Sequence, residues 1–465
     1  MTLKNVIAGL VLTTVGLTAA NAQNGVEKSE QVARTILADT IAMRTVSGYK
    51  MVPTMAKYLA AKFKSAGFDD KDIRIIPQGD TAMLVVRYHG NGSSGKKPIL
   101  FSAHMDVVDA LPADWQRDPY TLIEEDGYFF GRGIADNKFG IAMLTSTFMR
   151  LKSEGYMPSR DLIIAFSGDE ETEMKTTEAL STTYRDLIDA EYALVADGGG
   201  GLLAEDGTAI SFTVDHAEKT YVSFNVTAKN PGGHSSLPRK DNAIYDLARA
   251  LIKIDDYAFP VLQSELTKSY FSQSAPLFSG EEAAAMAAFA KDPTDQEAIK
   301  ILRAKPEHAG TTGTTCVATL LRGGHAENAL PQSATATVNC RIFPGVGAQA
   351  TLNSLKAVVA NDALEWSVVY KPVESDASPM RKDVLGALAN AVRVEYPNIP
   401  VVPHMASGAS DGLYFRAVGI PSYTFSGIFQ KASDEFAHGL NERIATNNLP
   451  NALKMWDSLI RELSQ

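Results

Sequence analysis

Short strand-like runs of apolar residues alternate with segments of helical spacing over the first half of the chain. Apolar residues recur at helical intervals over residues 27–65, 137–151 and 176–188, and an apolar run of strand length follows each of these segments. Such alternation is typical of an α/β domain, in which a mostly parallel, mixed sheet lies between helices. The expected strands are 73–77, 82–89, 98–103, 162–166 and 192–196.

The pattern changes near residue 215 and changes back near residue 376. The intervening segment mixes strands and helices as an α+β unit does. We therefore expect a discontinuous catalytic domain, residues 24–215 and 375–465, interrupted by an inserted lid domain, residues 216–374. The expected elements after residue 215 are strands at 219–228, 314–321, 335–343, 401–402 and 422–425, and helices at 241–254, 279–303 with a break near Pro293, 348–359, 382–394, 411–418 and 448–463.

The first 22 residues have the pattern of a signal peptide. Lys4 precedes an apolar run over 6–20, and Ala20-Asn21-Ala22 matches the small-residue cleavage pattern. A membrane anchor is the less favoured alternative, because a run of about 15 residues is too short to span a membrane comfortably. We expect an exported protein, periplasmic or secreted, with no membrane attachment after cleavage.

The composition is that of an ordinary globular protein, with 45% hydrophobic and 21% charged residues among 465. Lys and Arg number 44 and Asp and Glu 54, so the formal net charge is −10. Sequence-independent nucleic-acid binding needs a basic footprint, and no basic cluster stands out in the sequence. We therefore expect no nucleic-acid partner.

Two cysteines, Cys316 and Cys340, lie on two β-like runs of the expected lid, symmetrically about Asn328. In an antiparallel hairpin centred on the intervening loop, the two side chains would face each other at bridging distance. An exported compartment permits a disulfide, which is the pairing we expect. Two buried free thiols are the alternative.

Polar side chains follow three of the expected buried strands. His104-Met105-Asp106 ends one strand, Glu170-Glu171 comes shortly after the next, and Asp197 follows the third. In an open α/β sheet, sites form at the carboxyl ends of the strands. His104 and Asp106 point the same way from an extended segment, and a carboxylate beside a ligand histidine fixes its tautomer. Taken singly, each feature has an ordinary alternative: a surface histidine, a solvated acidic loop or a turn residue.

Two further residues complete this constellation. Asp136 follows a Gly-rich turn before an expected helix, where an aspartate can also serve simply as a helix cap. His438 lies far away in the sequence, within the returning α/β segment, and its alternative is an ordinary exposed histidine. Together, two histidines and three carboxylates suit two divalent ions that share a bridging carboxylate, with one carboxylate left over as a base.

The sequence resembles a family of dinuclear-zinc peptidases and deacylases that includes carboxypeptidase G, aminoacylase, carnosinase, acetylornithine deacetylase and succinyl-diaminopimelate desuccinylase. The long insertion and the NALP…VNCRI stretch are most similar to the carboxypeptidase S branch, which also contains hydrolases and synthases of N-acyl amino acids. The matching stretches, in family order, are SAHMDVV (102–108), GRGIADNKFG (131–140), SGDEETE (167–173), VADGGGG (195–201), NPGGHSS (230–236), GGHAENALPQSATATVNCRIFPG (323–345) and AHGLNERI (437–444).

The resemblance implies metal-binding and catalytic roles. His104, Asp136 and Asp197 would hold one Zn2+, and Asp136, Glu171 and His438 would hold the other, with Co2+ or Mn2+ as substitutes. Glu170 would be the general base, and Asp106 would orient His104. The family often has a cis peptide bond after the bridging aspartate, so we expect one at Asp136–Asn137.

The resemblance also implies residues that contact the substrate. His234, in the expected lid, would stabilise the oxyanion, and Asn328 and Arg341 match substrate-binding positions. The GASDG turn that begins at Gly408 lies where the family has a Gly-rich turn beside the substrate. A fixed guanidinium suits a carboxylate, so we expect Arg341 to bind a free α-carboxylate. A surface arginine paired with an acidic residue is the alternative.

These expectations define a zinc-dependent hydrolase that cleaves an amide bond next to a free C-terminal carboxylate, as a metallo-carboxypeptidase or dipeptidase does. An N-acyl amino acid deacylase with the same site is the alternative, which Asp197 weakly disfavours because family deacylases tend to have Glu there. A non-catalytic binding protein is disfavoured, since every expected ligand and the base are present. The expected partners are a peptide or N-acyl amino acid substrate and a second copy of the chain, joined through the lid.

Overall fold

The computed structural model describes residues 28–465, which form two compact units. The first unit comprises residues up to Phe212, Arg381–Val401 and Thr424–Gln465, and the second comprises Thr213–Met380 and Val402–Tyr423. The second unit thus contains residues 402–423 in addition to the segment predicted as the lid. The expected signal peptide lies outside the described residues. Within residues 28–465, no helix is long and apolar enough to cross a membrane.

The first unit is built on a mixed six-stranded sheet with the order β1-β2-β6-β3-β7-β17. The central strand β3 runs parallel to β6 on one side and to β7 on the other, while β1 and β2 form an antiparallel hairpin at one edge. Strands β3 and β6 are buried along their whole length, as the continuous apolar runs predict. The strands are β1 (Ile73–Gln78), β2 (Thr81–Tyr88), β3 (Ile99–His104), β6 (Leu162–Ser167), β7 (Tyr192–Val195) and β17 (Ser422–Thr424).

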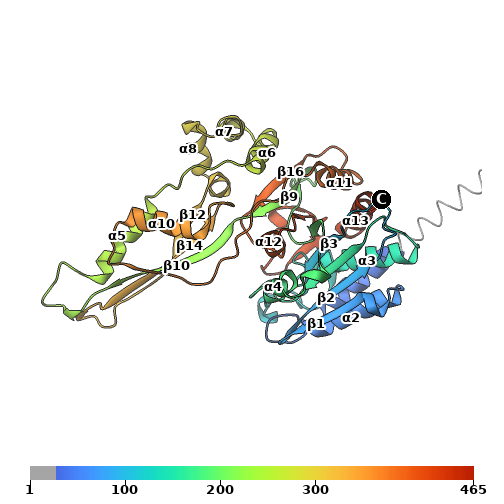
Figure 1. The fold of residues 1–465 in the computed structure, drawn as a ribbon, viewed down its shortest axis with the longest axis horizontal. Helices are drawn as coiled ribbons and strands as arrows, with labels where there is room; N and C mark the ends of the chain where they lie inside the picture. Colours follow the sequence, from blue (N-terminus) through green and yellow to red (C-terminus); the bar gives the residue numbers. More distant parts are fainter. Residues whose placement is uncertain (1–27) are drawn as a thin grey trace, which may run out of the picture. The chain divides into compact units, whose positions relative to one another are not determined.

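Helices cover this sheet and close the core of the first unit. Figure 1 shows α2 and α3 beside the strands, and α13 packs against α3. Phe101 of β3 makes edge contacts with Phe148 of α3 and Trp456 of α13, so three elements share one aromatic cluster. The α/β class expected from the sequence is confirmed. The helices are 28–41, α2 (Val52–Ser65), α3 (Lys138–Ser153), α4 (Lys175–Ser181), α11 (Lys382–Arg393) and α13 (Asn448–Leu463).

Some predicted helices are shorter than their periodicity indicated. The segment 27–65 contains two helices, because Gly48 adopts a positive φ of 86° in the connecting turn and Pro53 lies in the first turn of the second helix. In the segment 176–188 the α-helix ends at Ser181, and only a 3-10 turn at Arg185–Leu187 follows it. Two small groups of strands were not predicted. Strands β4 (Ile123–Glu125), β5 (Tyr128–Phe130) and β19 (Arg443–Ala445) form one sheet, and β8 (Gly200–Leu203) runs parallel to β18 (Phe429–Lys431).

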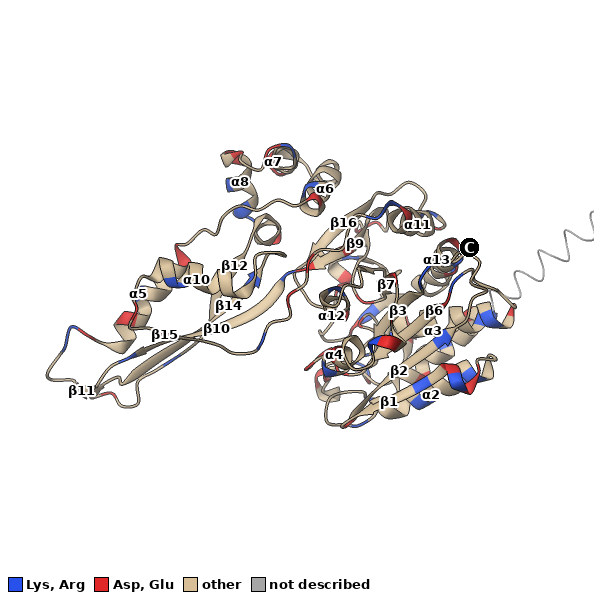
Figure 2. Cartoon of the chain, in the orientation of Figure 1, with Lys and Arg blue, Asp and Glu red and all other residues tan. Residues whose placement is uncertain are grey.

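The second unit contains a four-stranded antiparallel sheet of order β12-β14-β10-β15. Buried and half-buried residues alternate along β14, and its apolar face packs with β10 against the helices α5 and α10. Apart from Lys229 and Arg341, β10 and β14 carry no charged side chains (Figure 2). The elements are β10 (Thr220–Lys229), β12 (Thr315–Gly323), β14 (Ser333–Ile342), β15 (Glu365–Val368), α5 (Ala243–Asp255) and α10 (Ala348–Val359).

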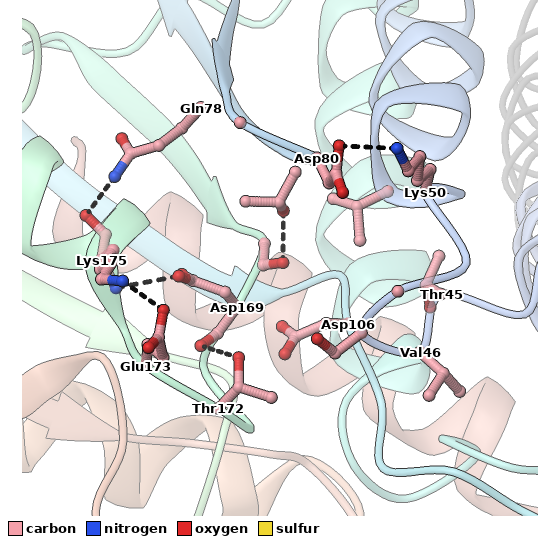
Figure 3. Close-up of a pocket in the computed structure, with 16 residues that line it drawn as sticks. Thr45, Val46, Lys50, Gln78, Asp80, Asp106, Asp169, Thr172, Glu173 and Lys175 are labelled. Carbon is pink, nitrogen blue, oxygen red and sulfur yellow. Dashed lines mark hydrogen bonds and ion pairs between the residues drawn. The ribbon is translucent and has the colours of Figure 1, made fainter.

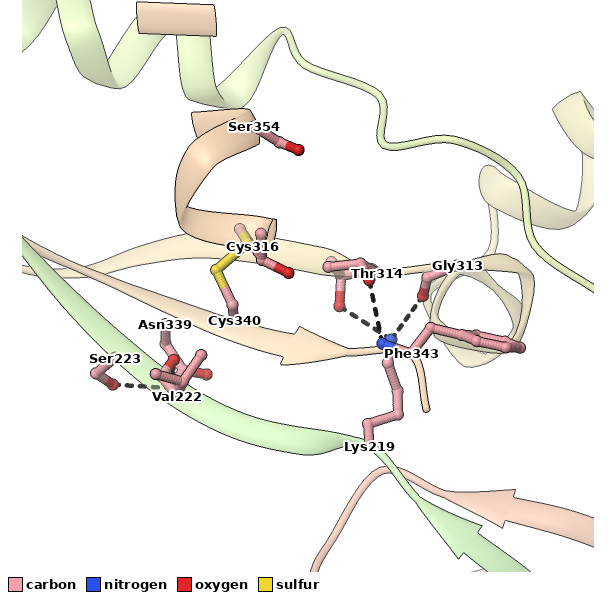
Figure 4. Close-up of a disulfide and its surroundings, with 12 residues drawn as sticks. Lys219, Val222, Ser223, Gly313, Thr314, Cys316, Asn339, Cys340, Phe343 and Ser354 are labelled. Carbon is pink, nitrogen blue, oxygen red and sulfur yellow. Dashed lines mark hydrogen bonds between the residues drawn. A yellow bond between two sulfur atoms is a disulfide. The ribbon is translucent and has the colours of Figure 1, made fainter. Parts of the chain in front are cut away.

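A disulfide joins the first two strands of this sheet. Cys316 and Cys340 are paired directly opposite each other in the β12–β14 ladder, and the bond between them is shown in Figure 4. The pairing predicted from their symmetry about Asn328 is confirmed. Close by, the buried Lys219 donates to the carbonyls of Gly310 (3.0 Å) and Gly313 (2.8 Å), which holds the turn before β12.

Four helices between α5 and β12 form a small helical group with a core of its own. Phe271, Met286, Phe289 and Leu302 are fully buried in that core. The other elements of this unit are β11 (Gly233–His234), β13 (Ala329–Leu330), β16 (Val401–Ala406) and α12 (Gly412–Ala417), with β9 (Ala209–Glu218) leading into it. The helices of the group are α6 (Glu265–Ser274), α7 (Gly280–Lys291), α8 (Gln296–Arg303) and α9 (Pro306–Ala309).

Candidate metal centre

Four acidic and histidine side chains meet at the carboxyl edge of the central strands. His104 is the last residue of β3, Glu170 and Glu171 follow β6, and Asp197 follows β7. Because β3 runs parallel to both neighbours, these three strand ends lie at the same edge of the sheet. The order of strands alone therefore brings together residues from three separate stretches of sequence.

Asp136 and His438 come to this edge from two loops. Asp136 precedes α3, and the peptide bond between Asp136 and Asn137 is cis, as expected from the resemblance. Gly140 allows α3 to approach the end of β7, since a Cβ there would lie 2.8 Å from the Cβ of Ala196. His438 has a positive φ of 62°, a left-handed conformation that is uncommon outside glycine.

The side chains form one continuous cluster. Nε2 of His104 lies 2.7 Å from Oδ1 of Asp136 and 3.8 Å from Oδ2 of Asp197. Nε2 of His438 lies 3.0 Å from Oδ2 of Asp136 and 2.9 Å from Oε1 of Glu171. Asp136 thus faces both histidines, one with each carboxylate oxygen, which is the position that a bridging ligand requires.

Asp106 fixes two parts of the cluster at once. Nδ1 of His104 lies 3.0 Å from the carbonyl oxygen of Asp106 and 3.5 Å from Oδ1 of its carboxylate, which leaves Nε2 directed at the cluster. The backbone N–H groups of Glu170 and Glu171 each donate to the Asp106 carboxylate at 3.0 Å. The predicted orienter of His104 therefore also holds the loop that carries both glutamates.

Asp106 also borders a cavity of about 300 Å³. Figure 3 shows Asp106 on its wall with Thr45, Asp169 and Thr172. The loop after β6 therefore has a cavity large enough for water molecules on one side. The two histidines do not line this cavity, and neither do Asp136, Glu170, Glu171 and Asp197.

The crowding of carboxylates shifts the pKa values of the histidines. Burial alone would lower the pKa of His104, but hydrogen bonds with Asp106 and Asp136 raise it well above its usual value. Hydrogen bonds with Asp136 and Glu171 raise the pKa of His438 to about 10. Burial opposes ionisation of Asp136, yet the two histidines hold its pKa well below the usual range. The carboxylates of the cluster thus stabilise positive charge on the two histidines.

The donor set fits divalent metal ions. Two groups, His104–Asp136–Glu171 and His104–Glu170–Asp197, each offer ligand atoms within 4.8 Å of one another. Imidazole nitrogen and carboxylate oxygen are ligands that Zn2+ and neighbouring divalent ions accept. An excess of carboxylates over histidines also supplies the negative charge that two cations need. The residues present therefore suit a pair of ions.

Two residues beside the cluster were not predicted from the sequence. Arg132 and Glu442 form a fully buried ion pair, with NH1 to Oε2 at 2.7 Å. Both lie inside motifs that carry the family resemblance, GRGIADNKFG and AHGLNERI. A charged residue inside such a motif, with no chemistry assigned to it, is the signal that could have drawn attention to them.

The predicted substrate-binding residues all lie in the second unit. His234 pairs with Ala329 next to Asn328, and its Nδ1 accepts a hydrogen bond of 2.8 Å from the Ser236 hydroxyl. Arg341 donates to the carbonyl of Ser407, which precedes Gly408, at 2.6 Å. The structure therefore brings these residues together as two pairs, His234 with Asn328 and Arg341 with the Gly408 turn. None of them belongs to the unit that holds the metal cluster.

A mixed sheet with such a cluster at the carboxyl ends of its parallel strands is typical of the class of metal-dependent hydrolases. Within that class, the chain belongs to peptidase family M20/M25/M40, whose model matches residues 100–462. It is therefore a hydrolase of peptide or related amide bonds.

Relatives of known name agree with this membership. The chain is 27% identical over 381 residues to the N-fatty-acyl-amino acid synthase/hydrolase PM20D1 of Xenopus tropicalis (78% of this chain, 72% of the relative). It is 25% identical over 389 residues to the probable carboxypeptidase S-like 2 of Dictyostelium discoideum (81% and 74%). Among solved structures, an M20 family metallo-carboxypeptidase from Sulfolobus solfataricus superposes with a TM-score of 0.68 at 18% identity, covering 92% of this chain and 98% of the other. A dinuclear metal-binding M20 peptidase from Bacillus subtilis has a TM-score of 0.62 at 13% identity, with 94% and 99% covered.

Proposed function

We propose that the cluster holds two divalent ions, Zn2+ in the native protein, and hydrolyses an amide bond next to a free carboxylate. His104, Asp136 and Asp197 hold one ion, and Asp136, Glu171 and His438 hold the other. The observation that carries this proposal is the position of Asp136, whose two oxygens face Nε2 of His104 at 2.7 Å and Nε2 of His438 at 3.0 Å. When bound, the ions supply Lewis-acid chemistry to the amide carbonyl and make water acidic near neutral pH.

Glu170 is the general base in this proposal. Its carboxylate lies within 4.8 Å of ligand atoms of His104 and Asp197, close enough to reach a water in the cluster. It takes a proton from that water and donates it to the leaving amine. The hydrogen bond from the Glu170 backbone N–H to Asp106 keeps the glutamate in place during both transfers.

In this proposal, Arg341 binds the free carboxylate of the substrate. Its NH1 donates to the Ser407 carbonyl and its guanidinium lies over the ring of Tyr221, at 4.7 Å from the centroid. Fixed in this way, the planar fork keeps donors for a bidentate contact with a carboxylate. Asn328 and the Gly408 turn complete the substrate contacts, and His234 stabilises the oxyanion after the lid closes or from a partner subunit.

Two substrate classes fit this arrangement. A peptide substrate makes the protein a carboxypeptidase or dipeptidase, in line with the carboxypeptidase S-like relatives. An N-acyl amino acid makes it a deacylase, and the identity to PM20D1 proteins, 27% in Xenopus and 26% in humans, favours this second candidate. Asp197 in place of glutamate leads us to put the peptidase first.

A metal-depletion assay tests the proposal. The purified chain is stripped with a chelator and then titrated with Zn2+, Co2+ or Mn2+, and hydrolysis of dipeptides and of N-acyl amino acids is measured at each step. We expect activity to vanish on depletion and to return as two ions bind. Activity that persists in the stripped chain would contradict the metal site, and the better substrate class decides between peptidase and deacylase.

The second unit is also the proposed dimer interface. Among the described residues, β12 pairs only with β14, so it is an edge strand, and its Val317, Leu320 and Leu321 side chains are exposed. An exposed apolar edge strand is a template for pairing with another chain. A second copy would extend the sheet about a two-fold axis. We further propose that the protein acts after export, to the periplasm or outside the cell, where the Cys316–Cys340 disulfide is stable.

A further inference from the structure

The buried pair Arg132–Glu442 lies directly beside the metal cluster and belongs to two loops that are far apart in sequence. Both side chains are almost fully shielded from solvent. A pair of charges is seldom buried unless its position serves the fold or the site. What each member contacts indicates which purpose it serves.

Glu442 organises the loop that carries Asp136. Its Oε2 accepts from the Gly133 N–H at 2.9 Å, and its Oε1 accepts from the N–H groups of Ala135 at 2.8 Å and Asp136 at 3.3 Å. Three backbone donors of one short loop therefore converge on a single carboxylate. The Glu442 side chain fixes the backbone of Asp136 itself, the residue that faces both histidines.

Arg132 organises the loop that carries His438. Its NH1 pairs with Glu442, while NH2 donates to the carbonyls of His438 at 3.2 Å and Gly439 at 3.0 Å. His438 needs this support because its φ of 62° lies in the left-handed region. The guanidinium also lies over the Trp115 ring, 5.2 Å from its centroid, which fixes its plane.

We propose that Arg132 and Glu442 are positioning residues that set the separation of Asp136 and His438, and thereby the affinity of the ion that these two ligands share. The inference rests on the ligand set of the proposed function. We call the Arg132–Glu442 ion pair the clamp. Without the clamp, the loops of Asp136 and His438 would have to be ordered by the ion alone, and part of the free energy of metal binding would be lost in ordering them. Changes to groups that hold metal ligands typically cost about 10–100-fold in metal affinity.

The test compares metal affinity with fold stability in the full chain. Glu442→Gln keeps the shape of the side chain but removes its charge, and Arg132→Lys keeps the charge but loses the planar fork that reaches both partners. Glu191→Gln is the matched control, because Glu191 pairs with the buried Arg160 just before β7, at the opposite end from Asp197. Zn2+ affinity is measured by competition with a chelator, and thermal unfolding of the metal-free chain reports the fold.

We expect Glu442→Gln and Arg132→Lys to weaken one of the two Zn2+-binding steps about 10–100-fold, with the fold retained, while Glu191→Gln leaves both steps unchanged. Excess Zn2+ should restore most of the turnover, because the catalytic groups are intact. If Glu442→Gln does not fold, Arg132→Lys decides. If the folded variants bind Zn2+ with wild-type affinity, the positioning role of Arg132 and Glu442 is wrong, but the ligand set stands. If the wild-type chain binds no ion, both the ligand set and the positioning role are wrong.

Discussion

Adjacent residues after β6 take part in different halves of the cluster. Glu171 lies 2.9 Å from His438, whereas the carboxylate of Glu170 groups with His104 and Asp197. Neighbouring side chains on an irregular segment point to different sides, and Asp106 holds both backbone N–H groups, so the division is fixed by the backbone. A ligand and a base can therefore stand next to each other in the chain without competing for one ion.

Glu170→Gln tests this division of roles. The substitution keeps the shape and removes the base, so we expect turnover to fall by at least about 10²-fold while metal content stays the same. Glu173→Gln, on the same loop but exposed and paired with Lys175, is the control and should be nearly neutral. Metal analysis accompanies the rate measurement. Near-normal turnover would reject Glu170 as the base, and loss of metal would make it a ligand.

Arg341→Ala tests whether the protein recognises a free carboxylate on its substrate. A guanidinium that meets a neutral amide instead of a carboxylate loses a charge pair worth about 2–5 kcal/mol, so the wild type should prefer a free acid over its C-terminal amide. The preference, measured as kcat/KM for both compounds, should largely disappear in Arg341→Ala and persist in the exposed Arg322→Ala. Equal wild-type rates on acid and amide would show that no carboxylate is recognised. A preference that survives in Arg341→Ala would move the role to Asn328 or the Gly408 turn.

At the scale of single elements, β9 contains a histidine without a hydrogen-bond partner for either ring nitrogen within residues 28–465. His216 is fully buried, and its ring packs edge-on against Tyr423, with centroids 5.0 Å apart. Burial lowers the pKa of His216 to about 4. Protonation of His216 therefore lowers the stability of the folded unit.

The pH dependence of stability follows from this histidine. Between its ordinary pKa near 6.5 and its folded pKa of about 4, the unfolded chain binds a proton that the folded chain does not. Stability should therefore fall as the pH drops through this window, by up to about 3 kcal/mol. The check is denaturant unfolding of the metal-free chain at pH 7 and pH 5. His216→Leu should flatten this part of the pH profile, and the exposed His325→Gln should not. An unchanged profile in His216→Leu would contradict the assignment.

Long elements were predictable from the pattern of apolar residues, and very short ones were not. The helices at 348–359 and 448–463 have the predicted bounds, because each carries three or more turns of apolar spacing. Strands β4, β5 and β19 have three residues each, too few to show any alternation, and they exist because they pair with one another. The Cys316–Cys340 bond was predictable because hairpin geometry relates distance along the chain to distance in space.

At the scale of the whole molecule, the rule that sites form at the carboxyl ends of parallel strands predicted most of the cluster. His104, Glu170, Glu171 and Asp197 follow from parallel strands alone, since each comes at or shortly after the end of a buried apolar run. His438 has no such local mark: the sequence placed it only within the returning α/β segment, and the family resemblance supplied its role as a ligand. The Arg132–Glu442 pair was missed because a sequence does not distinguish a buried ion pair from two surface charges.

Leu321→Lys tests the proposed dimer. A charge placed on the β12 edge should prevent strand pairing, so we expect the variant to be monomeric at concentrations where the wild type is dimeric. Met157→Lys, which places the same charge at an exposed apolar site of the first unit, should leave the assembly unchanged. Light scattering measures the mass. If His234 acts from the partner subunit, Leu321→Lys should lose as much turnover as His234→Ala, with metal content intact. A monomeric wild type would reject the interface.

The discontinuity of the first unit has a consequence for the order in which the protein becomes active. Chains are synthesised from the N-terminus, and compact units can form as soon as their residues are available. His104, Asp136, Glu171 and Asp197 precede the long segment Thr213–Met380, but His438 and Glu442 are made only after it. In the ligand set proposed here, a nascent chain that has not reached His438 and Glu442 lacks one ligand and one member of the ion pair that supports it. Hydrolytic activity is therefore withheld until both residues have been made.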